Sequence, residues 1–133
     1  MKKITVDTNV VLRLLVGDDE RQRAQAEEIL IHADRVFIPT TVFCEIVWVL
    51  LRSYKLSTAD VISALEQIIE IENAYLHEDE VMAGLELMRL GGDFADGVNE
   101  YCGRKMGGYE FATFDKKAAN LMIKQGKKIN FLK

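Results

Sequence analysis

The sequence predicts an α/β fold, a three-layer α/β/α sandwich around a central, mostly parallel sheet of four to five short strands. Short runs of β-branched and apolar residues alternate with longer helical segments along the chain. Apolar residues make up 49% of the 133 residues, which is enough for one core. Repeats, low-complexity tracts and linkers are not found in the sequence. We therefore expect a single domain over residues 1–133.

The first half of the chain is expected to alternate strands and helices. β-branched residues mark a buried strand at 3–6, and Gly17 ends the helix that follows it. Strong helix formers fill ERQRAQAEEILIH, and Pro39 stops the next strand. Thr40 and Thr41 are expected to cap the long apolar helix VFCEIVWVLLRSY. The expected ranges are 8–16 and 20–32 for the first two helices, 35–39 for the strand and 42–54 for the apolar helix.

The second half continues this alternation. Ser57 opens a helix that reaches about residue 72, and 73–77 is expected to hold a short strand. Gly91 and Gly92 separate two helices, and Asp93 is expected to cap the second. The remaining expected elements are helices at 78–90, 93–105 and 115–125 and strands at 109–113 and 129–132. In such sheets, function lies beyond the carboxyl ends of the strands.

Charge and composition limit the class of protein. The net charge is −4, yet residues 97–133 carry eight basic and three acidic residues. This basic third either binds a polyanion or is ordinary lysine-rich surface. The sequence contains no apolar run long enough for a membrane span, and Asp7 and Arg13 interrupt the N-terminal apolar stretch, which argues against a signal peptide. Cys44 and Cys102 are expected to be free, buried thiols of a cytoplasmic protein.

Three aspartates are expected at or near the starts of helices, two of them at junctions between a strand and the following helix. Asp7 and Asp115 each end a strand and begin a helix, and Asp96 lies in the first turn of another helix. Each residue by itself is explained by helix capping or by the helix dipole. Together they would crowd negative charge along one edge of the sheet. Such crowding is unfavourable without a cation.

Glu45 is the fourth acidic position. Its neighbours are apolar nearly all round the helix, so we expect its carboxylate to be buried, where it needs a partner. That partner is either an arginine, Arg52 or Arg13, or a metal ion shared with the aspartates. Oxygen ligands without His or Cys favour Mg²⁺ or Mn²⁺ over zinc. A site of this kind supports hydrolysis of a phosphodiester.

The motifs VDTNV, TTVFCEIVWVL, GGDFADGV and ATFDKKA together resemble the PIN domain, and their order and spacing resemble the VapC type of toxin ribonuclease. The resemblance implies a PIN-like fold and a Mg²⁺- or Mn²⁺-dependent endoribonuclease. It implies a homodimer and neutralisation by a small antitoxin protein. It also implies a ligand set that is both catalytic and metal-binding: Asp7, Glu45, Asp96 and Asp115. A PIN-fold module that binds RNA or protein without catalysis is the alternative.

Further residues receive secondary roles. The resemblance implies that Thr8, Asn9 and Thr113 support the ligands through hydrogen bonds. Asp93 is interpreted first as a helix cap, and its alternative role is that of a carboxylate that supports the ligands. Where the family commonly has Asp-Ala-Leu, this chain has a glycine, Gly97, which we expect to loosen the turn that carries Asp96. Basic residues near the predicted site are candidates for RNA binding: Arg104, Lys105, Lys116 and Lys117. Tyr101 and Tyr109 are expected to pack in the core or at its boundary, with stacking on bases as the alternative. Val42, Phe43 and Trp48 are expected to pack in the core, with an exposed apolar groove that docks an antitoxin helix as the alternative.

Overall fold

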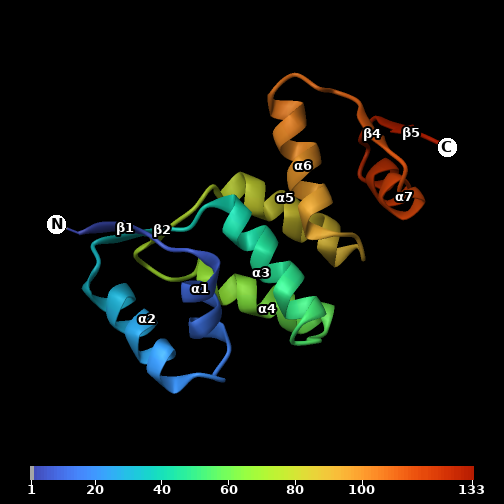
Figure 1. Cartoon of the computed structure of the whole chain (residues 1–133). Coiled ribbons are helices and arrows are strands. Elements are labelled where there is room, and N and C mark those ends of the chain that lie inside the picture. The colour runs from blue at the N-terminus through green and yellow to red at the C-terminus, as the bar shows by residue number, and fades with distance from the viewer. Residues whose placement is uncertain (1) are drawn as a thin grey trace. The chain divides into compact units, whose positions relative to one another are not determined.

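The computed structural model describes residues 2–133. These residues form two compact units: the N-terminal unit ends at His77, and the C-terminal unit spans Glu78–Lys133. Each unit has its own strands and helices (Figure 1). Each also contains buried apolar side chains. No helix among residues 2–133 is both long enough and apolar enough to cross a membrane.

The N-terminal unit is built on a parallel three-stranded sheet. Its strands are β1 (Lys3–Thr5), β2 (Arg35–Phe37) and β3 (Ala74–Tyr75), in the order β1-β2-β3. Ile4 is paired with Val36, and Phe37 with Tyr75. Val36 is buried, whereas the residues on either side of it in β2 are exposed, as the alternation of side chains along a strand requires.

Four helices accompany this sheet: α1 (Thr8–Leu15), α2 (Glu20–His32), α3 (Thr40–Arg52) and α4 (Thr58–Ile69). α1 packs against α2 and α3, and α3 packs against α4 (Figure 1). The side-chain amide of Asn73 donates hydrogen bonds to the carbonyl oxygens of Leu30 (2.8 Å) and Ala33 (3.0 Å). Asn73 thereby satisfies carbonyl groups at the end of α2 and fixes that end beside β3.

α3 buries one face only. Its buried side chains lie at positions 42, 43, 46, 47 and 50. Glu45 and Trp48 lie with Thr41 on an exposed stripe at helical spacing, and Trp48 is 58% exposed. Val42 and Phe43 are buried as expected, but the prediction that Trp48 is buried is wrong. The helix also starts at Thr40, two residues earlier than expected, with Pro39 instead of a threonine at the N-cap.

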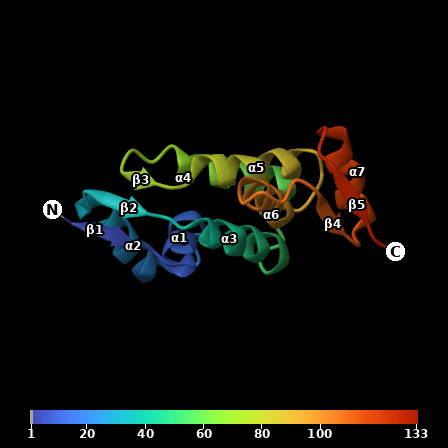
Figure 2. The same cartoon turned by 90° about the horizontal axis from the view of Figure 1, so that it is seen from above.

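The C-terminal unit begins with two helices, α5 (Glu78–Arg89) and α6 (Phe94–Lys105), which lie side by side (Figures 1 and 2). β4 (Phe111–Thr113), α7 (Lys116–Lys124) and β5 (Ile129–Phe131) follow. β4 and β5 pair in parallel, and α7 connects them and contacts both. This strand, helix and parallel strand form one βαβ unit.

Glycine allows α5 and α6 to approach closely. A Cβ atom added at Gly97 would lie 2.6 Å from the carbonyl oxygen of Ala83, and one added at Gly84 would lie 2.6 Å from the Phe94 ring. The expected loosening at Gly97 is not observed, because its backbone N–H donates to the Asp93 carbonyl oxygen in a regular first turn (3.2 Å). Gly97 is therefore a packing residue of the helix pair.

The α/β class and the parallel pairing of the strands are confirmed. All five expected strands and all seven expected helices occur among residues 2–133, within a few residues of the predicted limits. Their hydrogen bonds define one sheet of three strands and one of two. Neither Cys44 nor Cys102 forms a disulfide within residues 2–133, and both are partly accessible instead of buried.

Candidate functional site

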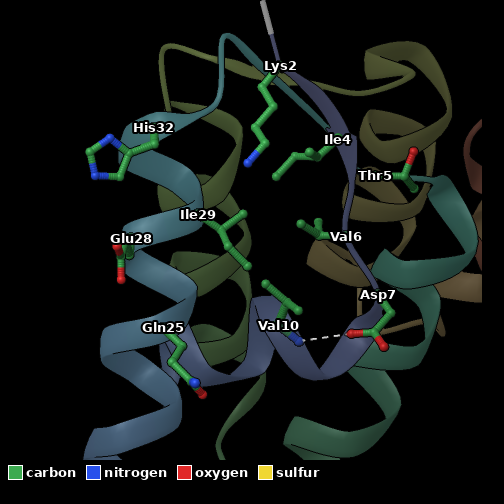
Figure 3. Close-up of a pocket in the computed structure, with 10 residues that line it drawn as sticks. All are labelled: Lys2, Ile4, Thr5, Val6, Asp7, Val10, Gln25, Glu28, Ile29 and His32. Atoms are coloured by element: carbon green, nitrogen blue, oxygen red, sulfur yellow. Dashed lines mark hydrogen bonds between the residues drawn. The ribbon is translucent and has the colours of Figure 1, made fainter.

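Asp7 caps α1 in the N-terminal unit. It follows β1 with extended backbone angles, and its carboxylate accepts a hydrogen bond from the Val10 N–H (3.1 Å; Figure 3). The residue itself is exposed. The capping oxygen is Oδ1, so Oδ2 keeps its capacity to bind a further donor or a cation.

A pocket of about 790 Å³ lies beside Asp7. Ile4 and Val6 of β1 face Ile29 of α2 across it, and Lys2 extends its ammonium group toward its interior (Figure 3). Asp7 and Val10 close its lower end in that view. The lining thus combines apolar side chains of β1, α1 and α2 with polar ones that include Asp7 and Lys2.

Asn9 and Arg13 line a second hollow beside Asp7, of about 420 Å³. Neither Thr8 nor Asn9 makes a side-chain hydrogen bond to Asp7 within residues 2–133. The Arg13 guanidinium pairs with Asp18, whose other oxygen accepts a hydrogen bond from the Tyr54 hydroxyl (2.8 Å). Arg13 is thus engaged with Asp18.

Glu45 is exposed, so the prediction that it is buried is wrong. The physical reason is that α3 has an exposed stripe, and Glu45 lies on it. The expected ion pair is also not found: Arg13 pairs with Asp18, and the Arg52 guanidinium lies over the Trp48 ring, 5.9 Å from its centroid. An exposed carboxylate needs no protein partner, because water solvates it. Burial of Glu45 therefore gives no argument for a metal.

In the C-terminal unit, Asp115 is held by hydrogen bonds of both its side chain and its backbone N–H. It follows β4 at the N-cap of α7, and its Oδ1 accepts a hydrogen bond from the Ala118 N–H (3.0 Å). Its own N–H donates to the Thr113 Oγ1 (3.0 Å). Thr113 thereby holds the backbone of Asp115 at the carboxyl end of the strand.

Asp96 is half-buried in the first turn of α6. Burial raises the pKa of its carboxyl group, and the negative charges of Asp93 and Asp115 raise it further. Asp93 occupies the N-cap of α6, as expected, but its side chain makes no capping hydrogen bond. Three aspartates of this unit therefore lie close enough for their charges to repel.

The candidate ligands fit a hard divalent cation by their chemistry, because all of them are carboxylates. Like-charge crowding at Asp96 is also what a cation would relieve. No group of three or more acidic, His or Cys side chains within residues 2–133 has the spacing of a metal site. The case for a metal thus depends on donor type and charge. Asp7 and Glu45 belong to the N-terminal unit, and Asp93, Asp96 and Asp115 to the C-terminal unit.

The basic residues that are candidates for RNA binding differ in their contacts with the rest of the protein. Arg104 pairs with Glu100, and Arg104 and Lys105 both lie over the Tyr101 ring, 5.5 and 5.8 Å from its centroid. Lys116 and Lys117 are exposed at the start of α7. The prediction that Tyr109 packs in the core or at its boundary is wrong, because its side chain is 74% exposed in the segment before β4. Tyr101 is half-buried, as expected of a boundary residue.

Glu100 is an acidic residue that the sequence analysis missed. It is only 5% exposed, and its carboxylate accepts hydrogen bonds from Arg104 Nε (2.9 Å) and Nη2 (3.3 Å). Lys127 Nζ pairs with Oε1, the oxygen that also accepts from Arg104 Nη2, at 3.0 Å, and this pair joins α6 to the segment before β5. Burial raises the pKa of Glu100, but the hydrogen bonds and charges of Arg104 and Lys127 outweigh it and hold the pKa below its usual value. The spacing of Glu100 and Arg104, four residues apart in a helix, was a usable signal.

These features define an α/β protein with acidic residues where strands end and helices begin. The family model of the PIN domain matches residues 4–122, and the chain therefore belongs to the PIN domain family. PIN domains are typically metal-dependent nucleases that act on nucleic acids, which places this chain in the nuclease class of hydrolases. A comparison with curated proteins finds no match.

Proposed function

We propose that this protein is a metal-dependent endoribonuclease and the toxin of a type II toxin–antitoxin pair. The observation that carries the proposal is membership of the PIN family over residues 4–122 together with an acidic residue at all four expected positions. A catalytically inactive binding module of the same fold is not favoured. Such a module has no need to keep four carboxylates.

We assign Asp7, Glu45, Asp96 and Asp115 as the ligands of Mg²⁺ or Mn²⁺. A divalent cation held by carboxylates activates water and offsets the charge that develops on the phosphate during hydrolysis. Support for Asp96 comes from its raised pKa, because a carboxylate crowded by Asp93 and Asp115 gains from a nearby cation. Support for Asp115 comes from Thr113, which fixes its backbone.

The supporting roles follow from the same assignment. Thr113 positions a ligand through the backbone, and Asp93, with no capping bond to keep it occupied, supplies a further carboxylate close to Asp96. Thr8 and Asn9 remain predicted supports of Asp7. Lys105, Lys116 and Lys117 attract the phosphates of RNA, and Arg104 does so only with the part of its guanidinium that Glu100 leaves accessible.

Cleavage of RNA by purified protein tests the metal mechanism. Wild-type protein is expected to cut total RNA in Mg²⁺ or Mn²⁺ and to stop in EDTA. Asp7→Asn and Asp96→Asn are expected to lose at least about 100-fold in rate, because disturbing even the groups that orient metal ligands costs 10- to 100-fold. Circular dichroism is expected to show folded variants.

Asp19→Asn is the matched control for Asp7→Asn. Asp19 caps α2 as Asp7 caps α1, with its side chain accepting from the Gln22 N–H at 3.0 Å. Asp19→Asn is expected to keep full activity, which separates capping from catalysis. Cleavage that persists in EDTA or in Asp7→Asn would overturn the metal mechanism, and RNA binding without cleavage would favour the inactive module.

The toxin role, the homodimer and the antitoxin require their own measurements. Expression of the wild type in the cytoplasm of a bacterial host is expected to arrest growth, whereas Asp96→Asn is expected to be tolerated. Light scattering of the purified chain is expected to give the mass of two copies. Growth that is equal for both proteins would remove the toxin role and leave the nuclease assignment standing.

A further inference from the structure

Phe114 is an apolar ring left in solvent next to a proposed metal ligand. It lies between the last residue of β4 and Asp115, and it is 72% exposed. Tyr109 is equally exposed but precedes β4, at the other end of the strand. Of these two rings, only Phe114 is therefore at the end where Asp115 lies.

The backbone on both sides of Phe114 is fixed. Thr113 accepts two hydrogen bonds, one at its Oγ1 from the Asp115 N–H (3.0 Å) and one at its carbonyl oxygen from the Leu132 N–H (2.8 Å). Asp115 in turn caps α7 through the Ala118 N–H (3.0 Å). The exposed ring is thus presented from a rigid turn, which lowers the entropic cost of binding a partner.

Two cations follow the ring, one residue beyond it, after Asp115. Lys116 and Lys117 are exposed at the start of α7, and neither has an ion-pair partner in the part of the chain that the structure describes. An exposed aromatic ring beside free cations matches an unpaired nucleic-acid strand, whose bases stack on aromatic rings and whose phosphates attract lysine. A duplex offers no such base face, because its bases are already stacked.

We propose that Phe114 is a positioning residue for substrate: its ring stacks on a base next to the cleaved phosphodiester, and Lys116 and Lys117 hold the neighbouring phosphates. The proposal rests on the nuclease function proposed above and adds to it the requirement for an unpaired base at the cut. A protein partner docking on the same ring is the competing occupant.

Binding measured in EDTA tests stacking without cleavage. Fluorescence anisotropy with a labelled single-stranded RNA of about ten nucleotides is expected to show 5- to 150-fold weaker binding for Phe114→Ala, the range of about 1–3 kcal/mol per stacked base. Phe114→Trp is expected to restore affinity, and Phe114→Leu, which keeps apolar bulk without a ring, is expected not to. Tyr109→Ala is the matched control and is expected to bind like the wild type.

A tryptophan at position 114 reports stacking directly. The chain has one tryptophan, Trp48, so the double variant Trp48→Phe/Phe114→Trp carries a single fluorophore at the proposed platform. Single-stranded RNA is expected to quench it, and duplex RNA of the same length is expected to do so only weakly. An RNA with one abasic position at the stacking base is expected to bind wild type and Phe114→Ala alike.

The outcomes separate this proposal from the nuclease assignment. Stacking that depends on Phe114, without cleavage in Mg²⁺ or Mn²⁺, supports the platform and overturns the nuclease. Cleavage with RNA affinity unchanged in Phe114→Ala overturns the platform alone and leaves the ring to a protein partner. Equal affinity of Phe114→Leu and wild type overturns stacking in favour of plain apolar contact, and no RNA binding by the wild type overturns both proposals.

Discussion

The two halves of α6 treat an acidic residue in opposite ways. Asp96, in the first turn, is half-buried beside two further aspartates, and its pKa is raised by burial and then by their charges. Glu100, one turn later, is buried more completely, yet its pKa is lowered because hydrogen bonds and charges from Arg104 and Lys127 outweigh the effect of burial. The fold therefore neutralises one carboxylate and leaves its neighbour's charge uncompensated.

This difference indicates which carboxylates serve structure and which serve function. Glu100 joins α6 to Lys127 and needs nothing further. Asp96 is costly to the isolated protein, and such costs are commonly found at functional sites. Asp7 and Glu45 are both exposed, so neither shows the cost of burial that Asp96 shows. Among the four proposed ligands, crowding at Asp96 is thus the strongest structural support for a cation.

Breaking the Glu100 pair is expected to have the largest effect on stability. Glu100→Gln keeps the shape of the side chain but removes the charge that two cations face, so we expect a loss of roughly 1–3 kcal/mol in the free energy of unfolding. Urea unfolding followed by circular dichroism measures it. The control is Glu110→Gln, whose exposed pair with Lys128 spans 3.6 Å and is expected to contribute almost nothing. Equal losses in both variants would contradict a structural role for Glu100.

Replacing two glycines of α6 by alanine is expected to change the stability of the protein in opposite directions. Gly97 lies between Asp96 and Glu100, and Gly103 follows Glu100. Gly97→Ala places a methyl group 2.6 Å from the Ala83 carbonyl oxygen, so it is expected to destabilise by about 1–3 kcal/mol. Gly103→Ala meets nothing within 4 Å and is expected to stabilise by up to about 1 kcal/mol through helix propensity. Thermal unfolding of both variants measures the contrast. A neutral Gly97→Ala would show that α5 and α6 separate at little cost.

The fold was largely predictable from local patterns. Helix formers and the capping residues Ser57, Asp93 and Asp115 marked the start of three helices, and Pro39 bounded a strand. These signals operate within a few residues and so are visible in one sequence. Close approach of α5 and α6 was not predictable, because Gly97 alone does not show that its partner across the interface is Ala83.

The candidate site was predictable in residue type but not in environment. Asp7 and Asp115 were expected to cap helices, and both do. Glu45 was misjudged because apolar neighbours in sequence do not reveal which stripe of α3 stays exposed. Glu100 was missed because one of its partners, Lys127, is distant in sequence. Phe114 was overlooked because an aromatic residue beside a strand usually packs inside.

The pH dependence of stability gives the finest test of the comparison along α6. Because the pKa of Asp96 is raised in the folded protein, its carboxyl group stabilises the folded state at pH values below its pKa in the unfolded chain, which is near 3.8. This contribution is lost as the pH rises through the pKa that Asp96 has in the folded state. Because the pKa of Glu100 is lowered in the folded protein, its carboxylate stabilises the folded state at pH values above its pKa in the unfolded chain, which is near 4.5. This contribution is lost as the pH falls through the pKa that Glu100 has in the folded state.

In EDTA at neutral pH, Asp96→Asn is therefore expected to be more stable than the wild type, and Glu100→Gln less stable. Both differences are expected to shrink when urea unfolding is repeated near pH 3.5. Asp79→Asn, in the exposed first turn of α5, is the control for loss of the helix-dipole interaction alone. Saturating Mn²⁺ is expected to reverse the order of Asp96→Asn and wild type, because a bound cation stabilises only the protein that keeps its ligand. A wild type that is already the more stable in EDTA would contradict the crowding on which the assignment of Asp96 depends.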